Sequence, residues 1–245
     1  MTSNRSAAQV SAADTKARAR SILSTRSAFQ SCSAELIDEI MKNTVVVRLA
    51  RGDIVYRQGE KGDSMMVVVS GSLKVTKLTA EGKELVLGFV RPGALIGEIA
   101  ALDGKERTAN VTSLEATEAV TIYRRDLLLI LRKNADAMFA LLDGLCDRLR
   151  TTNDLLESYT MESSARVAAC LVRLAGTHGQ TAKDGVEIDL KLTQRDLGSH
   201  LGLTRETISR TLGDFRDEGL ISLAGQTIVV HNREDLALIA EGSPD

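Results

Sequence analysis

The segment from Thr193 to Ile221 constrains the fold of this chain more than any other part. It contains two short amphipathic stretches separated by Gly202, a residue that permits a tight backbone turn. Each stretch follows a threonine, Thr193 or Thr204, whose hydroxyl can cap free backbone N–H groups, and Asp196 lies three residues after the first of them. This pattern predicts a helix-turn-helix.

The two faces of the predicted helices differ in chemistry. Apolar residues at helical spacing form the buried side: Leu197 and Leu201, then Ile208, Leu212 and Phe215 before a stop at Gly219. The opposite face of the second helix carries side chains that can contact base edges in a major groove: Arg205, Glu206, Ser209 and Arg210. An ordinary helical hairpin is the alternative, but the paired caps and this polar face favour binding to double-stranded DNA.

A short hairpin is predicted directly after this segment. Ile221-Ser222 and the run from Thr227 to Val230 flank a turn at Gly225-Gln226. A hairpin in this position turns the helix-turn-helix into a winged helix.

Length and charge limit the remaining classes of protein. The chain has 245 residues, enough for two ordinary domains, and a formal net charge of −2. Any binding to DNA must therefore come from a local arrangement of charges rather than from bulk attraction. The cysteines and histidines show no metal-ligand spacing, and we expect the three histidines to lie at the surface: His178, His200 and His231. Because no signal peptide or bilayer-spanning run is apparent, we expect a cytoplasmic protein with no membrane partner.

Short β-branched runs separated by glycine-bearing turns occupy the region from Thr44 to Tyr123. Many short strands with regular turns indicate a compact β-roll or barrel. Before this region, the stretch from Ala34 to Lys42 predicts a helix with Leu36, Ile37 and Ile40 inward. Residues 1–24 are rich in Ser, Ala and Arg, which predicts a flexible tail.

A long helix is predicted after the β region, over residues 135–160. Positions at alternating spacings of four and three form a seam: Met138, Leu142, Leu145, Leu149, Thr152, Leu156 and Tyr159. This pattern is typical of a two-stranded coiled coil and predicts a homodimer, whereas a helix packed on its own domain usually has a wider apolar stripe. The polar Thr152 either fixes the register of the two helices or meets something polar between them.

A further group of residues in the β region fits a sugar phosphate. It consists of Gly97, Glu98, Ile99 and Ala100, followed by Arg107, Thr108 and Ala109. A glycine beside a helical turn lets a ligand approach free backbone N–H groups, and an arginine can hold phosphate oxygens with its planar fork. A carboxylate can accept hydrogen bonds from ribose hydroxyl groups. An ion pair between Glu98 and Arg107 that stabilises a turn is the alternative.

The order of these parts, over residues of about 25 to 240, resembles the CRP/FNR family of bacterial transcription regulators. The Gly97–Ala100 and Arg107–Ala109 segments resemble the phosphate-binding cassette of that family, which binds cyclic nucleotides. The resemblance implies that Glu98 contacts the ribose 2′-hydroxyl and that Arg107 and Thr108 contact the cyclic phosphate. It also implies that Thr152, and Asn153 from the partner chain, lie beside the purine.

The family resemblance has two departures that bear on specificity. The cyclic-AMP receptor type carries Thr-Ser where this chain has Thr152-Asn153, and Asn offers both a donor and an acceptor. We therefore expect cyclic AMP as the effector, with cyclic GMP as the alternative, and no metal. Arg205-Glu206-Thr207 resembles the cyclic-AMP receptor subgroup, but Ser209-Arg210 resembles the FNR subgroup. The predicted half-site thus lies between TGTGA-like and TTGAT-like sequences.

In this interpretation the residues of the helix-turn-helix divide into two groups. Arg205, Glu206, Ser209 and Arg210 read bases, whereas phosphate contacts come from Thr193, Gln194, Thr204 and Thr207. The resemblance also implies RNA polymerase as a partner, through a surface loop from Thr177 to Gly185.

The sequence as a whole predicts an α+β protein in four parts: a tail (1–24), a cyclic-nucleotide-binding β-roll (25–134), a dimerisation helix (135–160) and a winged helix-turn-helix (161–245). We expect a cyclic-nucleotide-responsive, sequence-specific transcription regulator that binds a pseudo-palindromic operator as a homodimer. Two alternatives are a regulator of the same fold that binds DNA without a small ligand, and a nucleotide-binding adaptor with a degenerate winged helix. An enzyme is not expected, because no nucleophile–base pair or metal spacing appears.

Overall fold

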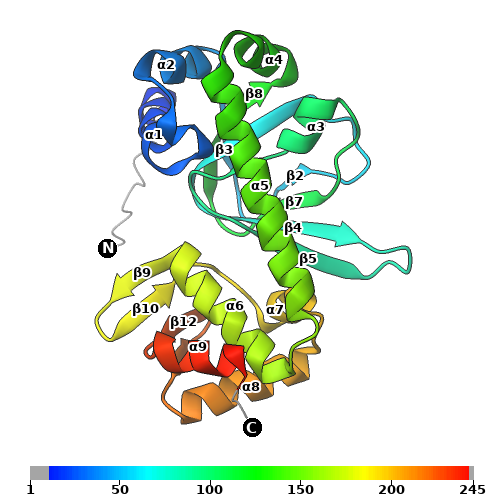
Figure 1. Cartoon of the computed structure of the whole chain (residues 1–245), viewed down its shortest axis with the longest axis vertical. Helices are drawn as coiled ribbons and strands as arrows, with labels where there is room; N and C mark the ends of the chain where they lie inside the picture. The colour runs from blue at the N-terminus through cyan, green and yellow to red at the C-terminus, as the bar shows by residue number, and fades with distance from the viewer. Residues whose placement is uncertain (1–10, 243–245) are drawn as a thin grey trace, which may run out of the picture.

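The computed structural model describes residues 11–242. The long helix α5 (Ala135–Ser158) runs along a β-sheet domain and ends at a smaller, mainly helical domain, as Figure 1 shows. This arrangement confirms the predicted α+β class and the order of β-roll, long helix and winged helix.

Within residues 11–242, the N-terminal domain contains two antiparallel four-stranded sheets with strand orders β1-β8-β3-β6 and β2-β7-β4-β5. Their strands are β1 (Thr44–Leu49), β2 (Ile54–Tyr56), β3 (Ser64–Ser70), β4 (Leu73–Leu78), β5 (Glu84–Val90), β6 (Leu95–Ile96), β7 (Asn110–Ser113) and β8 (Thr117–Tyr123). Apolar side chains from both sheets meet in one core, including Val68, Leu73 and Val111. The predicted β-roll is therefore confirmed.

The first helix, α1 (Ala12–Arg26), occupies part of the predicted tail. It begins at a capping box in which Ser11 and Asp14 exchange hydrogen bonds, and it buries Leu23 in the domain core. The prediction of a flexible tail is wrong over this helix, which its N-cap, its buried stripe and the bonds of Thr15 and Arg18 to Glu118 on β8 hold in place. The first ten residues of the predicted tail lie outside the described residues.

Helices cover the β1-β8-β3-β6 sheet on the side away from the second sheet. They are α1, the 3-10 helix η1 (Ala28–Ser31), α2 (Ala34–Lys42) and α4 (Arg124–Lys133). Helix α2 has the predicted bounds, is capped by Ser33 and buries Leu36, Ile37 and Ile40 as expected. A short helix, α3 (Glu98–Asp103), follows β6 and positions the predicted ligand residues.

The C-terminal domain has the predicted winged helix-turn-helix. Helix α7 (Gln194–Leu201) and helix α8 (Arg205–Asp217) are joined by a turn at Gly202, whose φ is +65°. The domain also contains α6 (Ser163–His178), β9 (Gly179–Ala182), β10 (Gly185–Ile188), the wing strands β11 (Ile221–Ala224) and β12 (Thr227–Val230), and α9 (Arg233–Glu241). Its sheet has the order β11-β12-β10-β9.

Two local expectations in this domain differ from the structure. The stretch from Thr177 to Gly185 is not a loop: it comprises the end of α6, strand β9 and the tight turn into β10. His200 is not a surface residue, since its exposed fraction is 0%. Its burial comes from contact with the N-terminal domain, to which no local sequence pattern points. No helix in the described part of the chain is long and apolar enough to span a membrane.

Candidate functional site

Gly97 marks the start of the predicted ligand cassette. It caps α3 with a left-handed backbone, φ +82°, which a glycine adopts readily. A Cβ atom added here would lie 2.6 Å from Nη1 of Arg107 and 2.7 Å from the ring of Tyr56. Glycine is therefore required both by the backbone conformation and by the close approach of these two side chains.

Arg107 lies against the wall of the cassette. Its exposed fraction is 6%, and its guanidinium donates to the carbonyl and hydroxyl oxygens of Ser64 and to the carbonyl of Gly97 at 2.6–3.0 Å. Its Cζ atom lies 3.6 Å from the centre of the Tyr56 ring. Burial raises the pKa of that phenol, although the nearby guanidinium acts in the opposite direction. The neutral Tyr56 ring thus packs against the guanidinium of Arg107 and restricts its orientation.

Glu98, the first residue of α3, faces the same cavity. Its exposed fraction is 3%, and Nη1 of Arg148 on α5 lies 2.8 Å from its Oε1. Even so, neither carboxylate oxygen accepts a hydrogen bond of good geometry from the described residues. A second nitrogen of Arg148 donates to the carbonyl of Leu95. The carboxylate therefore has a counter-charge but retains unused acceptor capacity, which is unusual for a buried group.

The ion pairs test the alternative in which Glu98 and Arg107 stabilise a turn. The ion pair of Glu98 is with Arg148, and the ion pairs of the described residues include none between Glu98 and Arg107. Arg107 instead bonds neutral groups of the β-roll. The alternative of a turn-stabilising Glu98–Arg107 pair is wrong.

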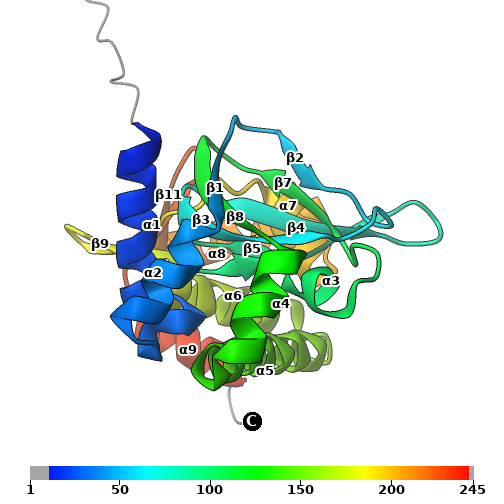
Figure 2. The same ribbon diagram turned by 90° about the horizontal axis from the view of Figure 1, so that it is seen from above.

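A cavity of about 40 Å³ connects these side chains. It is lined by Tyr56, Val75, Ile96, Gly97, Glu98, Ile99, Ala100, Arg107, Thr108, Ala109, Val111 and Arg148. The cassette residues named from sequence thus surround one space, although its volume is far below the roughly 300–1,000 Å³ of typical ligand pockets. Tyr56, Val75 and Arg148 were missed in the sequence, since each lies more than thirty residues from the cassette or on another element. Figure 2 shows α3 beside the sheets and near α5.

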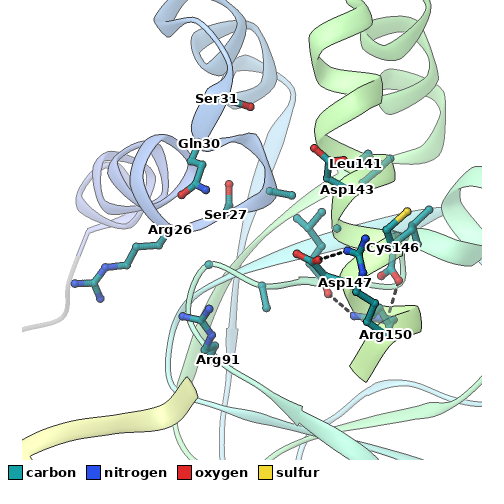
Figure 3. Close-up of a pocket in the computed structure, with 18 of the residues that line it drawn as sticks. Arg26, Ser27, Gln30, Ser31, Arg91, Leu141, Asp143, Cys146, Asp147 and Arg150 are labelled. Atoms are coloured by element: carbon teal, nitrogen blue, oxygen red, sulfur yellow. Dashed lines mark hydrogen bonds and ion pairs between the residues drawn. The ribbon is translucent and has the colours of Figure 1, made fainter. Parts of the chain in front are cut away.

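A larger cleft of about 940 Å³ lies beside the cassette. Figure 3 shows it between the N-terminal helical segment, which carries Ser27 and Gln30, and helix α5, which carries Asp147 and Arg150. Arg150 and Asp147 form an ion pair at 3.1 Å. The cleft shares Glu98 and Arg148 with the smaller cavity, so Arg148 stands on the wall between the two spaces.

Thr152 and Asn153 lie exposed on α5, one turn beyond Arg148. They do not line the small cavity of their own chain, and Thr152 donates to the carbonyl of Arg148. Several residues of the predicted seam are likewise exposed, with Leu149 at 62% and Leu156 at 59%. Large apolar side chains in such a stripe leave a helix face without an apolar partner in the monomer.

The second helix of the helix-turn-helix presents its predicted reading face to solvent. Arg205, Glu206, Ser209 and Arg210 are exposed, and Ile208, Leu212 and Phe215 are buried, as predicted. Thr204 accepts a hydrogen bond from the N–H of Thr207, and Thr193 forms a capping box with Asp196. A groove of about 520 Å³ runs between the start of α7, Arg205 and the wing turn at Gly225-Gln226, and includes Thr193 and Gln194.

No cluster of three or more His, Cys, Asp or Glu residues that could hold a metal ion occurs among residues 11–242. The three cysteines are free thiols: Cys32, Cys146 and Cys170.

Both domains of the chain match known protein families. Residues 46–134 match the model of the cyclic nucleotide-binding domain, and residues 165–239 match that of the Crp-like helix-turn-helix domain. The chain is 30% identical over 217 residues to the CRP-like cAMP-activated global transcriptional regulator of Mycobacterium tuberculosis, covering 88% of this chain and 97% of that protein. It is 33% identical over 180 residues to the cAMP-activated global transcriptional regulator CRP of Salmonella typhimurium, covering 72% of this chain and 85% of that protein.

Solved structures show the same fold. FixK2 from Bradyrhizobium japonicum superimposes with a TM-score of 0.74 at 22% sequence identity, over 82% of this chain and 99% of that chain. The relatives found are transcription regulators rather than enzymes, which confirms that expectation. With a β-roll that matches the cyclic nucleotide-binding domain, a winged helix-turn-helix after α5 and this level of identity over nearly the whole relative, the chain belongs to the CRP/FNR family of transcription regulators.

Proposed function

We propose that this protein is a transcription regulator whose binding to a pseudo-palindromic operator is controlled by cyclic AMP. Two relatives at 30% and 33% identity are named for activation by cAMP, which supports this effector. Cyclic GMP is the second candidate, because Asn153 offers both a donor and an acceptor to a purine edge. In this proposal the protein acts in the cytoplasm, and double-stranded DNA is its direct binding partner.

The observation that carries the proposal is the buried Glu98 carboxylate with unused acceptor capacity. A buried polar group that lacks hydrogen bonds is costly unless a ligand or water supplies them. Ribose hydroxyl groups would supply donors to Glu98, and the N–H groups at the start of α3, beside Arg107, would meet the cyclic phosphate. Among the cassette residues, Thr108 is exposed at the cavity edge, where its hydroxyl can also reach the phosphate.

Arg148 has a specific part in this proposal. Its ion pair with Glu98 joins α5 to α3 across the cavity. Because the cavity holds only about 40 Å³, a nucleotide enters only if Arg148 or a wall of the β-roll moves. Ligand entry would therefore break or rearrange the contact between Arg148 on α5 and Glu98 on α3.

We also propose a homodimer formed along α5. Leu142, Leu149 and Leu156 lie on one exposed stripe of this helix. Pairing two such helices would bury the stripes in a two-stranded coiled coil and bring Asn153 of each chain toward the ligand of the other. Two recognition helices would then be presented to half-sites about 34–36 Å apart.

In the DNA complex, the exposed face of α8 would read base edges. Arg205 and Arg210 would contact guanine, Glu206 would accept from a cytosine amino group, and Ser209 would adjust the choice of base. The hydroxyls and amide around the groove would anchor phosphates and set register: Thr193, Gln194, Thr204 and Thr207. RNA polymerase is proposed as a further partner, at the β9–β10 hairpin that replaces the predicted loop.

Isothermal titration calorimetry with cyclic AMP and, separately, cyclic GMP tests the effector. Glu98→Gln keeps the size of the side chain but removes the charge, and Arg107→Lys keeps the charge but removes the planar fork. Each should weaken the tighter ligand by about tenfold or more, because each removes hydrogen bonds to a charged group. Glu106→Gln, an exposed neighbour of Arg107, is the matched control and should bind as the wild type does.

The calorimetric result also decides the ligand-independent alternative. That alternative is favoured by the three hydrogen bonds that Arg107 already donates to protein groups without a ligand. Absence of binding by either nucleotide to the wild type, with specific DNA binding intact, would replace the proposed regulator with one that works without a nucleotide.

A further inference from the structure

Arg124 lies at the far end of the short helix that carries Glu98. Figures 1 and 2 both place this helix, α3, beside α4, which begins at Arg124. Helix α3 has no basic residue in its own last turn. Nη2 of Arg124 lies there instead and donates to the carbonyl of Leu102 at 3.2 Å. A cation at the C-terminal end of a helix stabilises the carbonyls that have no partner within it, so Arg124 completes α3 from another element.

Gly104, the residue after α3, lets the guanidinium approach the backbone. Its φ is +74°, and a Cβ atom added to it would lie 3.1–3.3 Å from Nη2, Cζ and Nε of Arg124. A side chain at this position would therefore push the guanidinium away from α3. The planar group thus packs against the turn that ends the helix and bonds the last turn of the helix itself.

The charge of Arg124 has no carboxylate partner. Asp103 pairs with Lys105 at 3.9 Å and Asp126 pairs with Arg125 at 3.0 Å, and residues 11–242 include no ion pair of Arg124. A cation in the first turn of α4 is also unfavourable for the dipole of that helix. Because neither a carboxylate nor α4 is stabilised by this charge, the contact with α3 is the interaction that accounts for its position.

The turn beneath α3 is tied to the same arginine. A Cβ atom added to Gly62 would lie 2.2 Å from the Cβ of Ala100, so this turn packs directly against the middle of the helix. The carbonyl of the next residue, Asp63, accepts a hydrogen bond from the backbone N–H of Arg124 at 2.6 Å. Arg124 therefore contacts the support of α3 through its backbone and the end of α3 through its side chain.

The position of α3 determines the position of the Glu98 carboxylate. At a rise of 1.5 Å per residue, the carbonyl of Leu102 lies about 6 Å along the helix axis from Glu98. Helix hydrogen bonds join the two ends, since Ala101 donates to Gly97 at 3.1 Å and Gly104 donates to Ala100 at 2.9 Å. A shift of the C-terminal end of this helix is thus felt at the carboxylate, little more than one turn away.

We propose that Arg124 is a positioning residue for the nucleotide. It holds α3, and through α3 the carboxylate of Glu98, in the place that the ligand requires, although it does not itself line the cavity. Binding then needs less ordering of the site, which raises affinity without any contact between Arg124 and the ligand. The ligand half of this inference rests on the proposed function, whereas its effect on the order of α3 requires no ligand.

Three substitutions at this position test the role of the guanidinium. Arg124→Met and Arg124→Gln both remove the charge, and the amide of Gln keeps a polar group at this half-buried place should Met prevent folding. Arg124→Lys retains the charge. Arg125→Met is the matched control, because Arg125 is an exposed neighbour that pairs with Asp126 rather than with α3. Circular dichroism and urea unfolding identify the variants that remain folded.

Calorimetric titration with cyclic AMP is the primary readout. Arg124→Met and Arg124→Gln should raise the dissociation constant about fivefold or more, Arg124→Lys should raise it less, and Arg125→Met should leave it unchanged. Hydrogen exchange supplies the readout of position. Exchange at the α3 amides should accelerate in ligand-free Arg124→Met and Arg124→Gln relative to the other β-roll amides, and should slow again when cyclic AMP saturates the site. A role in overall stability alone would lower the urea midpoint without this local change.

The outcomes separate this inference from the proposed function. Wild-type affinity for cyclic AMP in a folded Arg124→Met or Arg124→Gln protein would overturn the positioning role, and so would unchanged exchange at α3. An equal loss of affinity in Arg125→Met would also overturn it, because a general effect of positive charge would then explain the result. Absence of nucleotide binding to the wild type would instead overturn the proposed effector, and exchange at α3 would still decide whether Arg124 positions this helix.

Discussion

The guanidinium carbon of Arg107 lies 3.6 Å from the centre of the Tyr56 ring, so the cation rests on an aromatic face. Gly97 lies against the edge of both groups, and even one added carbon there would collide with them. The two terminal nitrogens of Arg107 also donate hydrogen bonds to the carbonyl and hydroxyl oxygens of Ser64. The position and plane of the proposed phosphate-binding group are thus set before any ligand arrives, which lowers the cost of ordering it on binding.

Replacement of the aromatic platform should weaken nucleotide binding. A desolvated cation–π contact is worth about 0.5–2 kcal/mol, so Tyr56→Leu should raise the dissociation constant of cyclic AMP by about two- to thirtyfold. Tyr56→Phe retains the ring and should bind nearly as the wild type does. Calorimetric titration of both variants measures the difference, and an equal loss in both would show that the hydroxyl rather than the ring matters.

Introduction of a charge at the seam of α5 should separate the subunits. Leu149 is mostly exposed in the single chain and central in the proposed interface. Leu149→Lys would place two ammonium groups in an apolar contact, so sedimentation velocity should report a monomer where the wild type gives a dimer. Asp154→Lys on the same helix lies away from the seam and should leave the dimer intact. A dimeric Leu149→Lys protein would refute pairing along this stripe.

The two classes of DNA contact should separate by substitution. Arg205→Ala should reduce discrimination at one base pair by about 1–3 kcal/mol, because a bidentate contact to guanine is lost. Gln194→Ala, a proposed phosphate contact, should weaken binding to operator and to random duplex by similar factors. Anisotropy titrations of both duplexes at one salt concentration provide the comparison. Equal losses on the two duplexes for Arg205→Ala would argue against base reading by that residue.

Acidification should destabilise the docked arrangement of the domains. Burial lowers the pKa of His200 to about 4 from a free value of 6.5. The hydrogen bond to the carbonyl of Val86 acts to raise this pKa, and the charge of Arg173 acts to lower it further. Between these two values the unfolded chain binds a proton that the folded chain does not, so stability falls as pH drops from 6.5 toward 4 and is unaffected above 7. A shift of this size corresponds to at most roughly 3–4 kcal/mol.

Urea unfolding at pH 7.5 and pH 5 measures this effect. His200→Asn removes the titrating ring while keeping an amide near the carbonyl of Val86, so its loss of stability on acidification should be smaller than that of the wild type. A residual loss is expected in the variant, because burial and the charges of Arg91 and Arg173 lower the pKa of His178 to about 4 as well. An identical loss in both proteins would show that His200 does not govern the acid sensitivity.

The features predicted from sequence are those that depend on neighbours along the chain. The caps at Thr193 and Thr204, the apolar spacing of α8 and the glycine-bearing turns of the β-roll act over a few residues, and the structure has them where they were predicted. The heptad pattern likewise predicted a helix over residues 135–160, and α5 spans Ala135–Ser158.

The features that sequence reasoning missed depend on contacts between distant segments. Arg148 on α5 forms an ion pair with Glu98 on α3 from fifty residues away. His200 is buried only because α7 meets β5, more than one hundred residues earlier in the chain. Helix α1 has few apolar residues, but Thr15 and Arg18 bond Glu118 on β8, and this tertiary contact holds it in place. None of these pairs leaves a periodic signal in a single sequence.

The central claim of this account is that nucleotide and DNA strengthen each other's binding, and one linked titration tests it most directly. The affinity of the wild-type protein for an inverted-repeat duplex is measured by anisotropy with and without saturating cyclic AMP, and the affinity for cyclic AMP is measured with and without that duplex. We predict that both affinities rise by the same factor, of about 5 to 150. A DNA affinity that does not change when cyclic AMP is bound would contradict the account.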